Sequence, residues 1–202
     1  MQKGALMEQL EEVFSSSPFS EKQVQQAVEE LENETFNRGL PEKGAFVEQA
    51  NEHGLSNADQ RDTANSEHHA SVKISPLILL VDDEEPFRRV IKQVLSIAGY
   101  DVVEAANGVE AVHQFYEKPA DMIITDIIMP EKEGIETVME IRDKFPAVKI
   151  IVISGGGWYG TEIDFDMAEK LGAVTFNKPF EINDLLSAVK RMLNKPGPKS
   201  GN

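Results

Sequence analysis

The chain has 202 residues and no cysteine, which excludes a disulfide framework and thiol chemistry. Its formal net charge is −15, and residues 1–74 and 75–202 are both acidic, so we expect no direct binding to nucleic acid. No apolar run is long enough to cross a bilayer, and the N-terminus has no apolar signal core, so we expect no membrane contact and a cytoplasmic location.

Residues 1–55 predict a small α-helical extension, whose role the sequence does not give. Ser20 and Gln23 have the spacing of a capping box and precede an apolar face at helical spacing. That face consists of Val24, Ala27, Val28, Leu31 and Thr35. Further short helices are expected at about 6–13 and 45–51. Because such helices bury little surface alone, they should pack on each other, on the C-terminal part, or on a second copy to give a dimer.

Two segments have the composition of unstructured chain. Residues 56–74 are almost wholly polar and predict a linker. Residues 196–202 contain two prolines and two glycines and predict a disordered tail. This tail is too short for an effector domain, so we expect the output to lie in residues 1–74 or in a separate protein.

Residues 75–195 alternate aliphatic runs with amphipathic stretches. The runs predict five strands, Leu77–Val81, Val102–Ala105, Met122–Thr125, Lys149–Ile153 and Val174–Phe176. The stretches that follow them predict five helices, at about 87–98, 108–116, 135–145, 162–171 and 182–193. Five βα repeats imply right-handed crossovers and a parallel sheet with helices on both faces.

Polar side chains stand at the ends of four of these strands. Asp82 and Asp83 follow the first strand, Asp126 the third and Ser154 the fourth, and Lys178 comes just after the fifth. Because the carboxyl ends of parallel strands converge on one edge of the sheet, we expect these five side chains to form one site.

Three carboxylates gathered there would repel one another by about 4 kcal/mol per pair at ~4 Å and an effective dielectric constant of ~20. Lys178 offsets one charge, and a divalent cation would offset two more. Mg²⁺ prefers carboxylate, carbonyl and water oxygens. We expect Asp83 and Asp126 as direct ligands, Asp82 holding a metal-bound water, and the backbone carbonyl of Ile128 as a candidate third ligand.

Asp126 is the best candidate for a nucleophile, because a carboxylate can attack phosphorus and form an aspartyl phosphate. The metal and Lys178 would neutralise charge on the phosphoryl oxygens. Ser154 could donate a hydrogen bond to the new phosphoryl group.

Four segments together resemble the receiver domain of two-component response regulators, of the kind found in chemotaxis regulators. These are Leu79–Glu84 (LLVDDE), Ile124–Pro130 (ITDIIMP), Ile153–Ser154 and Lys178–Phe180 (KPF). The resemblance covers about residues 75–195 and implies a flavodoxin-like sheet of order 2-1-3-4-5. It also implies a signalling module rather than an enzyme, with phosphorylation of Asp126 by a histidine kinase or a histidine phosphotransfer protein, self-catalysed hydrolysis, Mg²⁺ as cofactor, and an unknown downstream protein partner. In this family the bond matching Lys178–Pro179 is typically cis.

The chain departs from the family pattern in three places. Many relatives have a switching aromatic three residues before the lysine, where this chain has Thr175, with Phe176 one residue later. Either Phe176 takes that role in a shifted loop, or the aromatic switch is weakened. Trp158 and Tyr159 lie in a long glycine-rich segment and could pack on the domain or bind a partner. Ile128 is apolar and could shield the phosphoryl group from water.

Two other functions stay open on the sequence alone. One is a phosphatase of the haloacid-dehalogenase type, which uses similar groups but places its nucleophile after the first strand. The other is a receiver-like binding module that is never phosphorylated, which the complete set of acids, hydroxyl and lysine disfavours.

Overall fold

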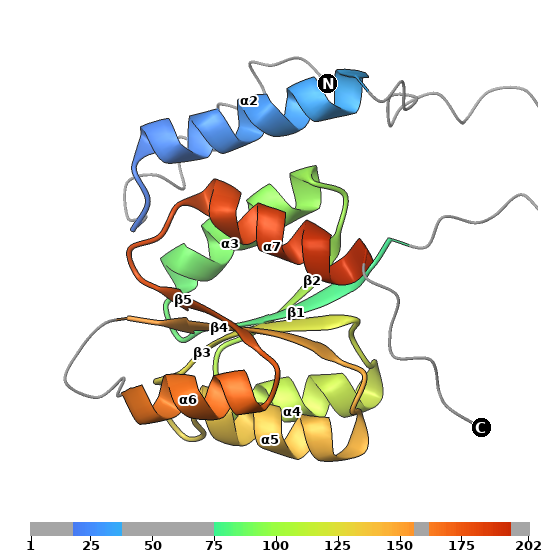
Figure 1. Ribbon diagram of the computed structural model, residues 1–202, viewed down its shortest axis with the longest axis vertical. Coiled ribbons are helices and arrows are strands. Elements are labelled where there is room, and N and C mark those ends of the chain that lie inside the picture. The colour runs from blue at the N-terminus through green and yellow to red at the C-terminus, as the bar shows by residue number, and fades with distance from the viewer. Residues whose placement is uncertain (1–17, 38–74, 156–161, 195–202) are drawn as a thin grey trace, which may run out of the picture.

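The computed structural model describes residues 18–37, 75–155 and 162–194, without the side chains of 34–37 and 162–165. Its strands are β1 (Leu77–Val81), β2 (Asp101–Ala105), β3 (Met122–Asp126), β4 (Lys149–Ser154) and β5 (Val174–Asn177). They form one parallel sheet of order β2-β1-β3-β4-β5 (Figure 1). The predicted flavodoxin-like sheet is therefore confirmed, with each strand within one residue of its predicted bounds.

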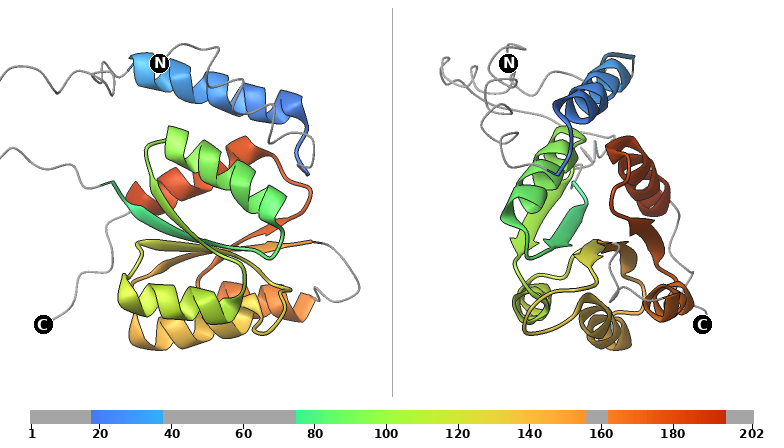
Figure 2. Two further views of the ribbon diagram at one scale, coloured as in Figure 1. Left: turned by 180° about the vertical axis from the view of Figure 1, so that it is seen from behind. Right: turned by 90° about the vertical axis from the view of Figure 1, so that its left-hand side faces the viewer.

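Helices follow each strand, as the repeat pattern predicts. They are α3 (Glu85–Ile97), α4 (Gly108–Glu117), α5 (Gly134–Lys144), α6 (Glu162–Lys170) and α7 (Ile182–Asn194). Helices α3 and α7 cover one face of the sheet, and α4, α5 and α6 cover the other (Figures 1 and 2). Within the described residues, no helix combines the length and the apolar character that crossing a membrane requires.

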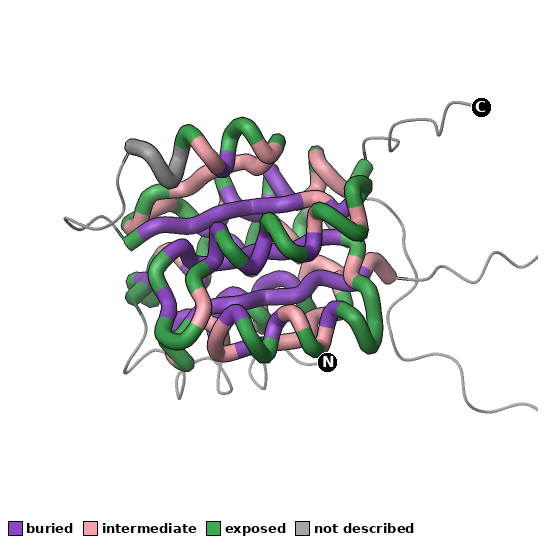
Figure 3. Tube along the Cα trace, turned by 90° about the horizontal axis from the view of Figure 1, so that it is seen from below, coloured by how far each residue is buried: buried purple, intermediate pink, exposed green. Residues whose placement is uncertain are grey.

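The strands separate two apolar cores, because successive side chains point to opposite faces. In β1, Ile78 and Leu80 join the core under α3 and α7, whereas Leu79 and Val81 join the core under α4, α5 and α6. All five residues of β1 are buried, as expected of a strand covered on both faces. Burial is concentrated in the three central strands, β1, β3 and β4, and alternates with exposure along the helices (Figure 3).

Helix α2 (Glu21–Asn37) lies across α3 and α7, on the side away from the sheet (Figure 2). The predicted capping box is present: the Ser20 N–H donates to Gln23 Oε1 at 3.0 Å, and the Gln23 N–H donates to Ser20 Oγ at 3.3 Å. Val24, Ala27 and Val28 of the predicted apolar face are buried. Of the three packing partners expected for this helix, the structure shows the C-terminal part of the chain. The helices expected at 6–13 and 45–51, the linker and the tail lie outside the described residues.

Candidate functional site

Lysine 178 meets two of the predicted acids at the carboxyl edge of the sheet. Its Nζ lies 2.8 Å from Asp82 Oδ2, after β1, and 2.9 Å from Asp126 Oδ2, at the end of β3. Glu84 is more distant, at 3.9 Å from the same nitrogen. The lysine thus bridges two strand ends that are far apart in the sequence.

The three carboxylates form a cluster in which one oxygen of each lies within 4.8 Å of the others: Asp82, Asp83 and Asp126. Asp82 and Asp126 are buried, at 0% and 6% exposure, and Asp83 is exposed. Three negative charges face one lysine charge, and all donors are oxygens, so the cluster fits Mg²⁺ in charge and in ligand type. The structure does not test Ile128 as a ligand, so the role of its carbonyl stays a prediction.

Backbone groups fix the two buried carboxylates. Asp82 Oδ1 accepts a hydrogen bond from the Glu84 N–H at 2.8 Å, and Asp126 Oδ1 accepts one from the Ile128 N–H at 3.3 Å. The first turn of α5 presses on the end of β3, because a Cβ on Gly134 would lie only 1.8 Å from the carbonyl oxygen of Asp126. The sequence therefore needs a glycine there to bring α5 against the strand that carries Asp126.

The chain around Lys178 is tied to the neighbouring strand end. The Lys178 N–H donates to the carbonyl of Ser154 at 2.7 Å, and the Lys178–Pro179 bond is cis, as the resemblance implies. Burial alone would lower the pKa of Lys178, but hydrogen bonds and negative charge from Asp82 and Asp126 outweigh burial and raise it. The lysine is therefore firmly cationic in the pocket.

Asp82 pairs with this cation and is still hard to ionise. Burial raises the pKa of Asp82 to about 6, against the lowering effects of Lys178 and of the Glu84 N–H. The negative charge of Asp126 makes a smaller contribution to this rise. The pocket is thus short of positive charge when Lys178 is its only cation, which is a second reason to expect a metal ion there.

Ser154 ends β4 inside this edge of the sheet. It is fully buried, and its Oγ has no hydrogen-bond partner among the residues that the structure describes. A buried hydroxyl without a partner costs free energy unless a ligand or water satisfies it. This agrees with a hydroxyl held ready for a group that binds in the pocket.

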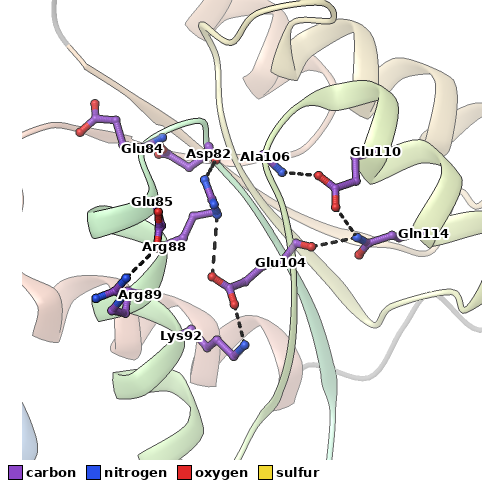
Figure 4. A network of polar contacts seen from close by, with 10 residues as sticks. All are labelled: Asp82, Glu84, Glu85, Arg88, Arg89, Lys92, Glu104, Ala106, Glu110 and Gln114. Atoms are coloured by element: carbon purple, nitrogen blue, oxygen red, sulfur yellow. Dashed lines mark hydrogen bonds and ion pairs between the residues drawn. The ribbon is translucent and has the colours of Figure 1, made fainter. Parts of the chain in front are cut away.

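Arginine 88 supports the site and was missed from the sequence. Its Nη1 donates to the carbonyl oxygen of Asp82 at 2.6 Å, while Glu104 lies 3.8 Å from its Nε and also pairs with Lys92 at 2.5 Å (Figure 4). The network links the turn after β1 to α3 and β2. Its signal in the sequence is only an arginine in the first turns of the helix that follows the acids, which is common at any helix surface.

Thr175 and Phe176 are the two candidates for the position of the switching aromatic. In the register of β4 and β5, Thr175 pairs with Val152, whereas Phe176 pairs with Ile153. Val152 and Ile153 belong to opposite cores, so Phe176 faces the α3 and α7 side. Thr175 and Phe176 therefore face opposite sides of the sheet, and which of them takes the switching role stays a prediction. Trp158 and Tyr159 lie outside the described residues.

Comparison with known proteins supports the geometry. Residues 78–190, more than half of the chain, match the model of the response regulator receiver domain family. The chain belongs to this family. The response regulator receiver protein CpdR of Brucella abortus is 34% identical over 116 residues, which cover 57% of this chain and 95% of the relative. The chemotaxis protein CheY of Bacillus subtilis is 39% identical over 119 residues, which cover 58% and 97%.

Solved receiver structures have the same fold. A response regulator receiver domain from Clostridium thermocellum is 32% identical with a TM-score of 0.53, and the match covers 59% of this chain and 94% of that one. A CheY-like receiver domain protein from Methanospirillum hungatei is 27% identical with a TM-score of 0.56, and the match covers 60% and 95%. The receiver domain of this chain is thus a signalling module of two-component systems, and α2 lies outside the matched residues.

Proposed function

We propose that the receiver domain accepts a phosphoryl group on Asp126, in a Mg²⁺-dependent reaction, from a phosphohistidine of a histidine kinase or histidine phosphotransfer protein. The observation that carries this proposal is the bridge from Lys178 Nζ to the carboxylates of Asp82 and Asp126. It puts a fixed positive charge beside the candidate nucleophile, where charge develops during phosphoryl transfer.

In the proposed step, a carboxylate oxygen of Asp126 attacks phosphorus, and the bond from phosphorus to the donor histidine nitrogen breaks with its electrons going to the imidazole. Lys178 neutralises phosphoryl oxygens, and the buried hydroxyl of Ser154 donates to one of them. Asp82, Asp83 and Asp126 would hold the metal, with the Ile128 carbonyl as a candidate ligand. Bound Mg²⁺ would supply positive charge to the phosphoryl oxygens.

We infer that phosphorylation changes the contacts around Ser154 and thereby the binding of a downstream protein. Lys178 is joined to Ser154 through its own N–H, so a change at either residue is passed to the other strand end. The identity of the kinase and of the downstream partner, a cytoplasmic location and a dimer through the N-terminal helices stay predictions. The apolar face of α2 is already covered by α3 and α7, so it is not free for such a dimer in this arrangement.

Labelling with acetyl phosphate tests the proposal. We expect the full chain to gain the mass of one phosphoryl group in Mg²⁺, to gain none when EDTA removes the metal, and to lose the label in hydroxylamine, which cleaves acyl phosphates. A chain that stays unlabelled, and is also unchanged by beryllofluoride in Mg²⁺, would support the phosphorylation-independent module instead. Rapid turnover of small phosphate esters would support the phosphatase.

The raised pKa of Asp82 predicts that metal binding depends on pH. Mg²⁺ competes with a proton for this group of carboxylates, and the proton wins below the pKa of about 6. We therefore expect Mg²⁺ affinity to be level above about pH 7 and to fall by up to about tenfold per pH unit below about pH 6. Titration calorimetry checks this. In Asp82→Asn the fall near pH 6 should disappear, and a level affinity down to about pH 5 in the wild type would contradict the prediction.

A further inference from the structure

Four phenylalanine rings from separate segments pack together beside the acidic pocket. They form what we call the phenylalanine cluster: Phe19 before α2, Phe87 in α3, Phe176 in β5 and Phe180 after the cis proline. Phe19 contacts two of the other rings, with centroids 5.6 Å from Phe87 and 5.5 Å from Phe180. Phe180 in turn lies 5.4 Å from Phe176. The cluster thus joins the N-terminal extension to three elements of the receiver domain.

The cluster touches the lysine of the site directly. Lys178 Nζ lies 4.1 Å from the centroid of the Phe87 ring, within the range of a cation–π contact. The same nitrogen reaches Asp82 and Asp126, so the ammonium lies between an aromatic face and two carboxylates. Phe180 is two residues after Lys178. Phe19 therefore packs on the ring that Lys178 Nζ contacts, Phe87, and on the ring two residues after the lysine, Phe180, and these two rings also contact each other at 6.2 Å.

Phe19 is held in place by the start of α2. It is buried, and it directly precedes the capping box of Ser20 and Gln23. Gln23 also donates from Nε2 to Glu181 Oε2 at 3.1 Å, next to Phe180 in the chain. The extension is thus anchored to the lysine loop at two neighbouring points, whereas Val24, Ala27 and Val28 anchor the rest of α2 through apolar burial.

We propose that Phe19 is a positioning residue for Lys178: by packing on Phe87 and Phe180, it holds the ammonium where it meets both carboxylates. The lysine has a flexible four-carbon stem, so its position at the pocket depends on the groups that surround it. Truncating Phe19 removes a packing partner from two rings at once and leaves space into which Phe87 and Phe180 can move. Part of the phosphorylation machinery then lies outside the matched receiver residues.

This proposal rests on the proposed phosphorylation of Asp126. Its test compares the Phe19→Ala variant with the wild-type full chain. We expect the initial rate of labelling by acetyl phosphate to fall about tenfold, because a misplacement of about 1 Å can cost ~10²-fold in such a step. Mg²⁺ affinity by calorimetry should be unchanged or tighter, since a loosened Lys178 competes less with the metal. General damage to the fold would instead weaken metal binding and labelling together.

Val28→Ala is the matched control, because it shortens a buried side chain of α2 that is outside the cluster. Its labelling rate should change by no more than about twofold. If Phe19→Ala fails to fold, Phe19→Leu keeps apolar bulk and should show a smaller slowing in the same direction. Equal labelling of wild type and both Phe19 variants, faster labelling, equal slowing by Val28→Ala, or a parallel loss of Mg²⁺ affinity would overturn the proposal. An unlabelled wild type would instead reject phosphorylation of Asp126.

Discussion

Asp126→Asn is expected to abolish phosphorylation of the full chain by acetyl phosphate. The amide has the shape of the carboxylate but lacks the negatively charged oxygen that attacks phosphorus. Asp82 still offers Lys178 a carboxylate at 2.8 Å, so the pocket should keep its lysine and the chain its fold. Mass measurement in Mg²⁺ gives the readout, with the fold checked by circular dichroism.

Asp101→Asn is a matched control for this change. Asp101 is exposed at the start of β2, so it lies at the N-terminal ends of the strands, whereas the site lies at their C-terminal ends. It should be labelled as fast as the wild type. Residual label on Asp126→Asn would place the acceptor elsewhere. If Asp82→Asn removed the label and Asp126→Asn did not, the phosphatase would regain support, because its nucleophile follows the first strand.

The residues of the pocket could be predicted from the sequence, because its reactive side chains stand at the ends of strands. β1 is a wholly aliphatic run, and β3 and β4 each contain a short apolar run that ends just before the site residue or one residue earlier, so the strand ends are easy to locate. Parallel topology then brings Asp82, Asp126 and Ser154 together. No contact between distant segments has to be guessed. The bridge from Lys178 to two acids follows from the same rule.

The docking of α2 could not be predicted in this way. Helical spacing shows that Val24, Ala27 and Val28 share a face, but periodicity does not say which surface covers it. Phe19 and Val24 have the positions of a hydrophobic staple around the capping box, which predicts a contact within the helix start. It gives no sign that Phe19 meets Phe87 and Phe180, because those residues are distant in the sequence and carry no motif in common.

The face of the sheet to which Phe176 points could have been predicted from the sequence, by counting residues along β5. Strand residues alternate between faces, so Thr175 and Phe176 must face opposite cores once β5 is placed. Phe176 lies on the face under α3 and α7, where Phe180 and Phe19 continue the packing. The aromatic contacts near Lys178 therefore lie on the side of the sheet that carries α2.

Lys178→Ala is expected to slow labelling of Asp126 by about 10²–10³-fold, the range for loss of one preorganised donor at a developing charge. The same change should tighten Mg²⁺ binding by at least about tenfold, because it removes a positive charge that competes for the carboxylates. Labelling rates and calorimetry measure the two effects. Slower labelling together with tighter Mg²⁺ binding would indicate a direct electrostatic role of Lys178, because damage to the pocket would slow labelling and also weaken Mg²⁺ binding.

Stability gives a third and independent measure of this lysine. Without Lys178, Asp82 and Asp126 share a buried pocket with no cation, and breaking a buried ion pair costs about 3–5 kcal/mol. The lysine side chain is 16% exposed, so we expect the metal-free variant to lose less, about 2 kcal/mol in free energy of unfolding. Saturating Mg²⁺ should recover most of the loss. Lys170→Ala, at the exposed end of α6, is the control and should change none of the three measurements. A Lys178→Ala chain that is labelled at the wild-type rate would show that the metal alone supplies the positive charge, and the bridge seen in the structure would then have no part in the chemistry.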